Sequence, residues 1–276
     1  MKRIIFYLPL ITLTALFISC GDQSTIELEE TSNEQKSKDA TSTFMMYENA
    51  KKMEEIDARL DKSERVESLS WEKQTKDHGS EFTQVIAYLN EDGLPMKITE
   101  SFIDGNYRPQ GERHFYLENN KLIAYQENTD FWVDSLTTKY MEKRTVYNDS
   151  EPVITQKRSA YQYTEINDSV WKIIPAEHHS LKKVNKILTG VEEFQTHFIS
   201  VIKANDLFLL LGENKPQTEE RYTTAVRVDE MTPFIEDLLK NLEEYKFRPV
   251  EISFEVVGGT NSPEFRVLKD IAWKNK

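Results

Sequence analysis

The chain has 276 residues, 47 of them acidic and 35 basic, so its formal net charge is −12, and 38% of its residues are hydrophobic. This surplus of negative charge repels phosphate backbones, which argues against nucleic acid as a partner. The single cysteine, Cys20, leaves no pair for a disulfide and too few thiols for a cysteine-based zinc site.

The first twenty residues have the three parts of an export signal. The positive charge comes from Lys2 and Arg3, and an apolar run follows from Ile4 to Ile18. A small residue then precedes the cysteine, in Ser19-Cys20. The apolar run is shorter than the roughly 20 residues that a membrane-spanning helix needs, and Pro9 interrupts it. We therefore predict a cleavable signal peptide over residues 1–19 rather than a retained transmembrane helix.

The segment Phe17-Ile18-Ser19-Cys20 resembles the lipobox of bacterial lipoproteins, in which a signal peptidase cuts before a cysteine that has been diacylated on sulfur. It departs from the commonest form, which has Leu three places before the cysteine and Gly or Ala just before it. The resemblance implies lipidation of Cys20, with acyl chains such as palmitate, and anchoring to the inner or outer membrane on its periplasmic or outer side. The alternative is an ordinary secretory signal with an incidental cysteine.

Cleavage would remove two basic residues and no acid, so the mature chain would have a formal net charge of −14. An acidic body is repelled by anionic headgroups, so the lipid on Cys20 is the expected membrane contact. Residues 20–43 are dominated by Ser, Thr, Glu, Asp, Lys and Gln, which predicts a disordered tether between this lipid and the folded body.

From residue 44 to residue 65 the apolar side chains recur at helical spacing: Met46, Met53, Ile56 and Leu60. The stripe is too short for a coiled coil of three or four heptads. We therefore predict a helix over 44–65 that packs on its own domain.

From residue 66 to residue 175 apolar and polar residues alternate, which is typical of half-buried antiparallel strands. Short polar turns separate the strands, at Asn90 to Gly93, Asp104 to Asn106, Asn119 to Lys121, Asn148 to Pro152 and Asn167-Asp168. The pattern predicts an antiparallel β-meander. Lys97, Thr99 and Ser101 alternate with apolar residues, so we expect their face of the sheet to be solvated.

A loose internal repeat runs through the meander. Each unit has an aromatic strand end, then a polar turn, then an apolar strand start, and the three strand ends are Tyr88-Leu89, Tyr116-Leu117 and Val146-Tyr147. Such units occur in repeat architectures, but successive hairpins of any meander produce the same pattern. We favour the second interpretation.

Residues 176–276 mix helical and alternating periods. We expect a helix that ends near Gly190, a hairpin over 198–211 and a strand over 222–228. A second helix, opened by Thr232-Pro233, is expected over 232–246, and two final strands over 250–257 and 265–273. The predicted fold class is therefore α+β: the antiparallel meander is followed by a smaller mixed α+β portion with two helices. We expect this portion to fold around its own core, with the meander docked beside it.

The sequence contains no motif for catalysis, nucleotide binding or metal binding. The one histidine cluster is Glu177-His178-His179, and adjacent histidines rarely ligate the same metal because their side chains diverge. Gly258-Gly259 lacks the spacing of a phosphate-binding loop and is expected to be a hairpin loop. We therefore predict no catalytic residue, no metal site and no cofactor.

Tyr and Trp crowd the meander, as they do in sugar or peptide clefts, but they are also favoured in strands for packing alone, which is the interpretation we prefer. The favoured function is a lipid-anchored cell-envelope lipoprotein with a non-enzymatic binding or scaffolding role, whose partner is an envelope protein, a glycan or a peptide. One alternative is an acyl-chain or lipoprotein carrier, which predicts a curved sheet with two apolar faces. Another is a carboxylate-dependent glycan hydrolase, which requires two acidic side chains that converge in an aromatic cleft.

Overall fold

The computed structural model describes residues 40–76, 79–105, 109–134, 136–215, 220–259 and 262–274. The predicted signal peptide, Cys20 and the tether up to residue 39 lie outside these residues. Over the described ranges the chain is mostly antiparallel sheet with a few short helices, which confirms an α+β fold with a meander. None of the helices in these ranges is long and apolar enough to cross a bilayer.

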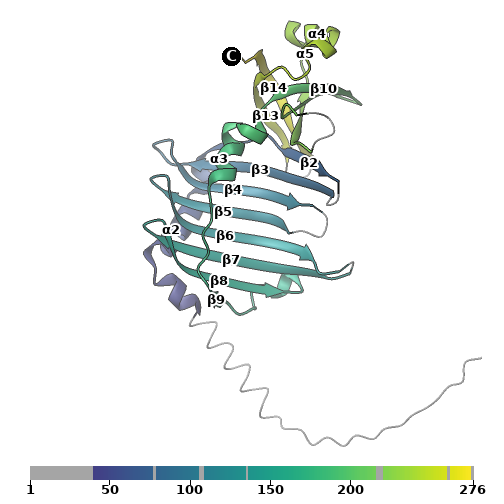
Figure 1. Ribbon diagram of the computed structural model, residues 1–276. Helices are drawn as coiled ribbons and strands as arrows, with labels where there is room; N and C mark the ends of the chain where they lie inside the picture. The colour runs from purple at the N-terminus through teal and green to yellow at the C-terminus, as the bar shows by residue number, and fades with distance from the viewer. Residues whose placement is uncertain are drawn as a thin grey trace, which may run out of the picture.

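The meander forms the central part of one hydrogen-bonded sheet (Figure 1). Its strands are β2 (Trp71–Thr75), β3 (Gly79–Leu89), β4 (Pro95–Asp104), β5 (Gln110–Glu118), β6 (Lys121–Trp132), β7 (Thr138–Asn148), β8 (Glu151–Ala160) and β9 (Lys172–Ile174). Each strand pairs antiparallel with the next one in the chain. A further strand, β1 (Glu64–Glu67), pairs with β3 beside β2.

The loose sequence repeat corresponds to three successive hairpins with one shared feature. In β3–β4, β5–β6 and β7–β8 the pairing register shifts at the strand end before the turn, after Tyr88, Tyr116 and Val146. The turn residues Asn119-Asn120 and Asp149-Ser150 have positive φ angles, as two-residue hairpin turns require. The turn chemistry in the sequence therefore sets the register of the meander.

One face of the sheet is covered by the N-terminal helices. Residues 40–45 are helical, α2 (Glu48–Asp57) follows, and a single 3₁₀ turn, η1 (Leu60–Lys62), leads into β1. The helix predicted over 44–65 thus begins earlier, breaks once and ends sooner, because residues 64–67 pair with β3. Phe44, Met53 and Ile56 pack on residues of β4 to β8.

The expectation that Lys97 faces solvent is wrong. The Lys97 side chain is 9% exposed, because α2 covers it and Asp57 Oδ1 lies 2.7 Å from its Nζ. Thr99 on the same face is also 9% exposed and lies 3.1 Å from His114 Nδ1. The Asp57 carboxylate at the end of α2 neutralises the Lys97 ammonium, so this polar face of the strand can be buried.

The other face is covered by the segment that follows β9. This segment crosses the sheet and forms α3 (Lys182–Thr189) in front of β3 and β4, and the 3₁₀ turn η3 (Glu192–Phe194) comes next (Figure 1). Val184 and Ile187 of α3 are buried against the sheet, and Gly190, at φ 61°, ends the helix as predicted.

The C-terminal portion extends the sheet beyond β2. It consists of β10 (His197–Lys203), β11 (Leu207–Gly212), β12 (Thr223–Val228), α4 (Pro233–Lys240), α5 (Leu242–Tyr245), β13 (Val250–Gly259) and β14 (Ser262–Trp273). The single helix predicted over 232–246 is split at Asn241, whose φ of −126° is not helical. β12 continues the sheet by pairing with β2 at Thr223 and Glu72.

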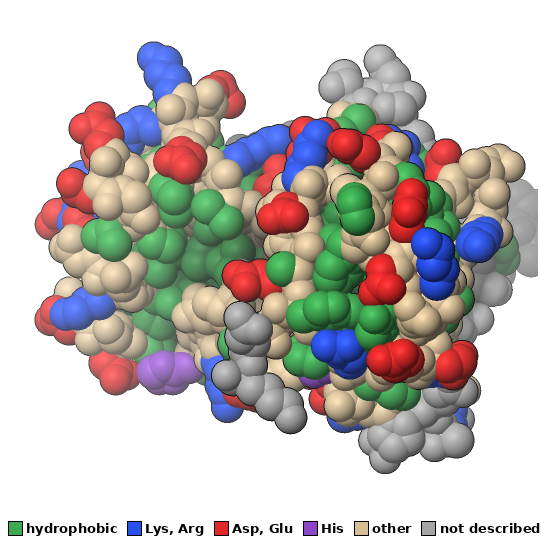
Figure 2. Space-filling model, turned by 90° about the horizontal axis from the view of Figure 1, so that it is seen from above, with side chains coloured by type: hydrophobic (Ala, Val, Ile, Leu, Met, Phe, Trp, Pro, Cys, Tyr) green, Lys and Arg blue, Asp and Glu red, His purple; other side chains and the backbone are tan. Residues whose placement is uncertain are grey.

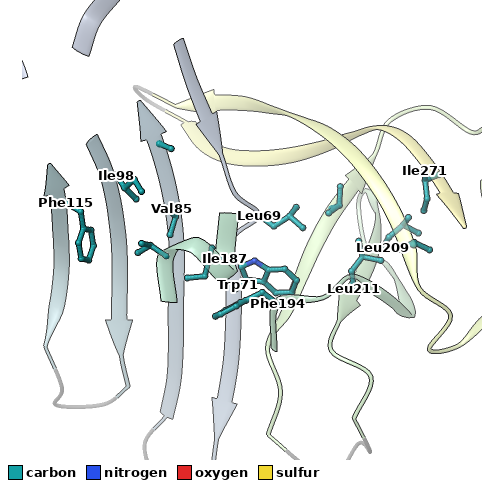
Figure 3. Close-up of a cluster of buried hydrophobic side chains, with 14 of the residues drawn as sticks. Leu69, Trp71, Val85, Ile98, Phe115, Ile187, Phe194, Leu209, Leu211 and Ile271 are labelled. Atoms are coloured by element: carbon teal, nitrogen blue, oxygen red, sulfur yellow. The ribbon is translucent and has the colours of Figure 1, made fainter. Parts of the chain in front are cut away.

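The largest buried cluster joins the two portions. It contains Val85, Ile98 and Phe115 of the meander together with Leu209, Leu211, Ile235 and Leu238 of the C-terminal portion. Figure 3 shows Leu69 and Trp71 between the two sets of strands, and the rings of Trp71 and Phe194 are 5.7 Å apart. The core expected for 176–276 alone therefore continues into the meander. Seen from above, charged side chains of both signs surround a hydrophobic patch in each half of the molecule (Figure 2).

Candidate functional site

A groove of about 820 Å³ lies at the edge of the sheet formed by β8 and β9. Its lining includes three basic side chains, Lys157, Arg158 and Lys172, and the apolar side chains of Trp171 and Ile173. Ala40, the first residue that the structure describes, also lines it. Ile173 is 58% exposed, although it is a large aliphatic side chain. The groove is therefore both cationic and apolar, on a chain whose net charge is −12.

A column of stacked side chains lies behind Trp171, which lines this groove. The guanidinium carbon of Arg144 lies 3.9 Å from the ring centroid of Phe44 and 4.1 Å from that of Trp171. Arg158 lies 4.6 Å from the same Trp171 ring. Cation–π contacts of this kind are stronger where the groups are desolvated. The column therefore fixes the helical N-terminal residues against the strands.

Gln156 connects the column to the point where the chain enters the body. Arg144 Nε and Nη2 donate to Gln156 Oε1 at 3.1 and 2.9 Å, and Gln156 Nε2 donates to the carbonyl oxygen of Ala40 at 2.6 Å. Gln156 has no exposed surface. Because the donor and the acceptor of this fully buried amide both have partners, Gln156 holds Ala40 in a specific position.

The groove keeps positive charge that the surrounding residues do not neutralise. Arg158 is paired with Glu142 at 2.6 Å, but across the described ranges neither Arg144, Lys157 nor Lys172 has a carboxylate within ion-pair distance. Burial, and then repulsion by Arg158, lower the pKa of Arg144 to about 10. This local cationic surplus suits an anionic ligand.

The strand beside the groove is the terminal strand of the sheet. β9 pairs with β8 through three residues, Lys172 to Ile174, and the strand order ends at β9. The outer edge of such a strand presents backbone N–H and C=O groups, to which an extended peptide can add as a further strand.

A second cluster of charged residues is buried between the sheet and α3. Glu100 of β4 is 1% exposed, and its carboxylate lies 2.8 Å from Lys183 Nζ and 3.1 Å from Arg113 Nη1. Burial alone would raise the pKa of Glu100, but Lys183 and Arg113 hold it below its usual value. Glu100 is therefore the charged partner that fastens α3 to the meander.

Glu127 reaches the same arginine from the next hairpin. Its carboxylate is 3.8 Å from Arg113 Nε and accepts a hydrogen bond from the Tyr125 hydroxyl, whose pKa is raised by burial and by that carboxylate. Two carboxylates thus converge, as a glycan hydrolase would need. They are 1% and 9% exposed and paired with cations or a hydroxyl, so their geometry is that of an internal ion network rather than of an open cleft.

The predicted histidine cluster is divided among different partners. The His179 ring stacks on Tyr125 with 3.6 Å between centroids, and its Nε2 lies 3.2 Å from Thr145 Oγ1. Burial, and then the charge of Lys143, lower the pKa of His179 to about 4. His178 points to solvent, and Glu177 pairs with Lys143 at 2.7 Å. Among the described residues no group of His, Cys, Asp and Glu is arranged to hold a metal ion.

The aromatic residues of the meander fall into two groups. Tyr116, Tyr125 and Tyr147 are at most 2% exposed, so packing explains them. Trp132, Tyr161 and Tyr163 are 55%, 59% and 72% exposed, so more than half of the surface of each lies outside the packed interior. The sequence did not single out the groove, because its cations are brought together with Ala40 by contacts distant along the chain.

Comparisons of the chain with protein-family models, with curated proteins and with solved structures gave no match. The predicted lipidation site, Cys20, lies outside the described residues.

Proposed function

We propose that this chain is a lipid-anchored cell-envelope lipoprotein whose folded body binds an extended acidic peptide without catalysing a reaction. The observation that supports this best is the cationic and apolar groove beside the terminal strand β9, on an otherwise acidic protein. The partner would be a segment of another envelope protein.

The anchor is supported by the lipobox-like segment at Cys20 and by the position of Ala40. Ala40 lines the groove, and 20 residues separate it from the proposed lipid. A flexible linker of that length has a root-mean-square span of roughly 25 Å. The groove would therefore lie near the membrane, on its periplasmic or outer side.

The preference for an acidic peptide follows from two features of the groove. The edge of β9 offers backbone hydrogen bonds that any extended peptide can form. Lys157 and Lys172, which have no carboxylate partner in the described chain, would select for acidic side chains. Ile173 and Trp171 would contact the apolar side chains that alternate with them.

A binding titration tests this function. A fluorescent peptide of alternating Glu and Val is mixed with protein that carries Cys20→Ala, so that the protein stays out of membranes. We expect Lys172→Glu to weaken binding by about tenfold, which corresponds to about 1.4 kcal/mol. The matched control is Lys182→Glu, which makes the same charge change at an exposed position at the start of α3. A peptide of alternating Gln and Val should bind more weakly than the acidic one. Equal affinity for both peptides, or equal weakening by both substitutions, would contradict the proposal.

A further inference from the structure

Exposed aromatic and aliphatic side chains gather at one end of the meander. Trp132 ends β6 and Val133 follows it, Leu136 lies in the turn before β7, and Tyr161 and Tyr163 follow β8. We call these five residues the aromatic tip. Leu136 is 95% exposed and Val133 is 52% exposed. In the described part of the chain, the large aromatic side chains with the greatest exposure are the three in this tip.

The residues of the tip lie at one end of three neighbouring strands, β6, β7 and β8. Trp132 pairs with Thr138 across β6 and β7, and Tyr140, two residues further along β7, has its ring 5.6 Å from that of Tyr163. Lys139 Nζ lies 5.6 Å from the centre of the Tyr161 ring. Because Tyr140 pairs with Ala160 across β7 and β8, the two loops lie at the same end of the sheet.

The turn at the tip is ordered so that Leu136 points outward. Val133 N–H donates to the carbonyl oxygen of Thr137 at 2.8 Å, and Asp134 Oδ1 accepts from Leu136 N–H at 2.8 Å. By contrast, Tyr116 and Tyr147 of the same meander are at most 2% exposed. A group of large apolar side chains that are each more than half exposed often marks a contact with another molecule or with a membrane.

The tip lies on the side of the sheet where the chain enters the body. Tyr161 directly follows β8, and residues 157–159 of β8 line the groove together with Ala40. A lipid on Cys20 would keep Ala40 within roughly 25 Å of the bilayer on average. The anchor would therefore hold this edge of the body close to the membrane.

From these observations we infer that the aromatic tip inserts into the interfacial region of the bilayer to which Cys20 is anchored. This inference rests on the lipid anchor in the proposed function. The rings of Trp and Tyr favour the level of the headgroups, and Leu136 and Val133 would reach the boundary of the acyl chains. The mature chain is acidic and Asp134 lies within the turn, so contact is through apolar surface and is strongest with zwitterionic lipid.

Fluorescence quenching by brominated lipid tests the contact. The lipidated protein is placed in phosphatidylcholine vesicles whose acyl chains carry bromine close to the headgroup. We expect tryptophan fluorescence to be quenched, and Trp132→Phe to lose most of that quenching. The matched control is Trp273→Phe, because Trp273 packs against Phe234 and Tyr245 in the C-terminal portion, and this variant should keep the quenching. Leu136→Asp, at a 95% exposed position, should reduce quenching without unfolding the protein.

The outcomes separate the tip from the anchor. No quenching in a protein that carries labelled fatty acid and sediments with vesicles would overturn the inference while leaving the anchor intact. Loss of fatty acid and of sedimentation would instead refute the anchor. If Trp132 becomes shielded from a water-soluble quencher in lipid-free detergent as protein concentration rises, a second copy covers the tip and the inference is wrong.

Discussion

Lys183 Nζ on α3 lies 2.8 Å from Oε1 of Glu100, a carboxylate of β4 that is almost fully buried. Arg113 Nη1 contacts Oε2 of the same carboxylate at 3.1 Å, and Thr83 Oγ1 donates to Oε1 at 3.0 Å. One carboxylate thus links three strands of the meander to the segment that leads into the C-terminal portion.

We expect Glu100→Gln to destabilise the fold by about 3 kcal/mol or more, because it leaves Arg113 and Lys183 without their buried counter-charge. Urea denaturation measures the change. The matched control is Glu118→Gln, which removes an exposed ion pair with Lys52 and should cost less than about 1 kcal/mol. Similar losses for the two variants would show that Glu100 does not fasten α3.

Stability should fall between pH 6.5 and pH 4. Burial, followed by the charge of Lys97, lowers the pKa of His114 from 6.5 to about 4. Between these values the unfolded chain binds a proton that the folded chain does not, so stability decreases as pH falls, by up to about 1.4 kcal/mol per pH unit. Urea denaturation at several pH values should give a smaller slope for His114→Gln. An unchanged slope, or an equal reduction by His178→Gln at an exposed position, would contradict this assignment.

A single added methyl group should distinguish two glycines. Gly111, at φ 148°, lies in β5, where an added Cβ would clash with the Asn128 carbonyl oxygen and lie 2.9 Å from Thr129 Cα. We expect Gly111→Ala to lower the free energy of unfolding by at least about 2 kcal/mol more than Gly93→Ala does. Gly93 also has a positive φ, 75°, but nothing lies within 4 Å of its added Cβ, so it is the control for backbone strain alone. Equal losses would mean that β5 and β6 separate easily at this position.

Local chemistry made much of this fold predictable. The pairs Asn119-Asn120 and Asp149-Ser150 contain residues that tolerate positive φ, and Gly190 ends α3 for the same reason. These signals lie within a few residues of the structure they determine. The alternation of apolar and polar residues then placed the strands of the meander.

The missed features depend on residues that are far apart in the sequence. Lys97 is buried because Asp57, 40 residues earlier, neutralises it. The groove exists because Gln156 fastens Ala40, 116 residues away. β1 has one apolar residue, Val66, so its sequence carries little strand signal, and only its pairing with β3 makes it a strand.

The shared core predicts that the two portions unfold together. Leu238 of α4 has no exposed surface and belongs to the cluster that also contains Val85 and Ile98 of the meander. Leu238→Asp would bury an unpaired carboxylate and should cost several kcal/mol. Hydrogen exchange should then show loss of protection in the meander as well as in β10 to β14. Protection that is lost only after residue 175 would show that the C-terminal portion is a separate folding unit.

Lipidation of Cys20 is tested most directly by labelling cells with a fatty-acid analogue and comparing the wild-type chain with Cys20→Ala. Because Cys20 is the only cysteine, the substitution removes every thiol to which an acyl chain could be attached. We expect the label and membrane fractionation to be lost together in the variant, while its folded body keeps the circular dichroism spectrum of the wild type. Label that persists in Cys20→Ala, or a wild-type chain that takes up none, would contradict the assignment of this protein as a lipoprotein.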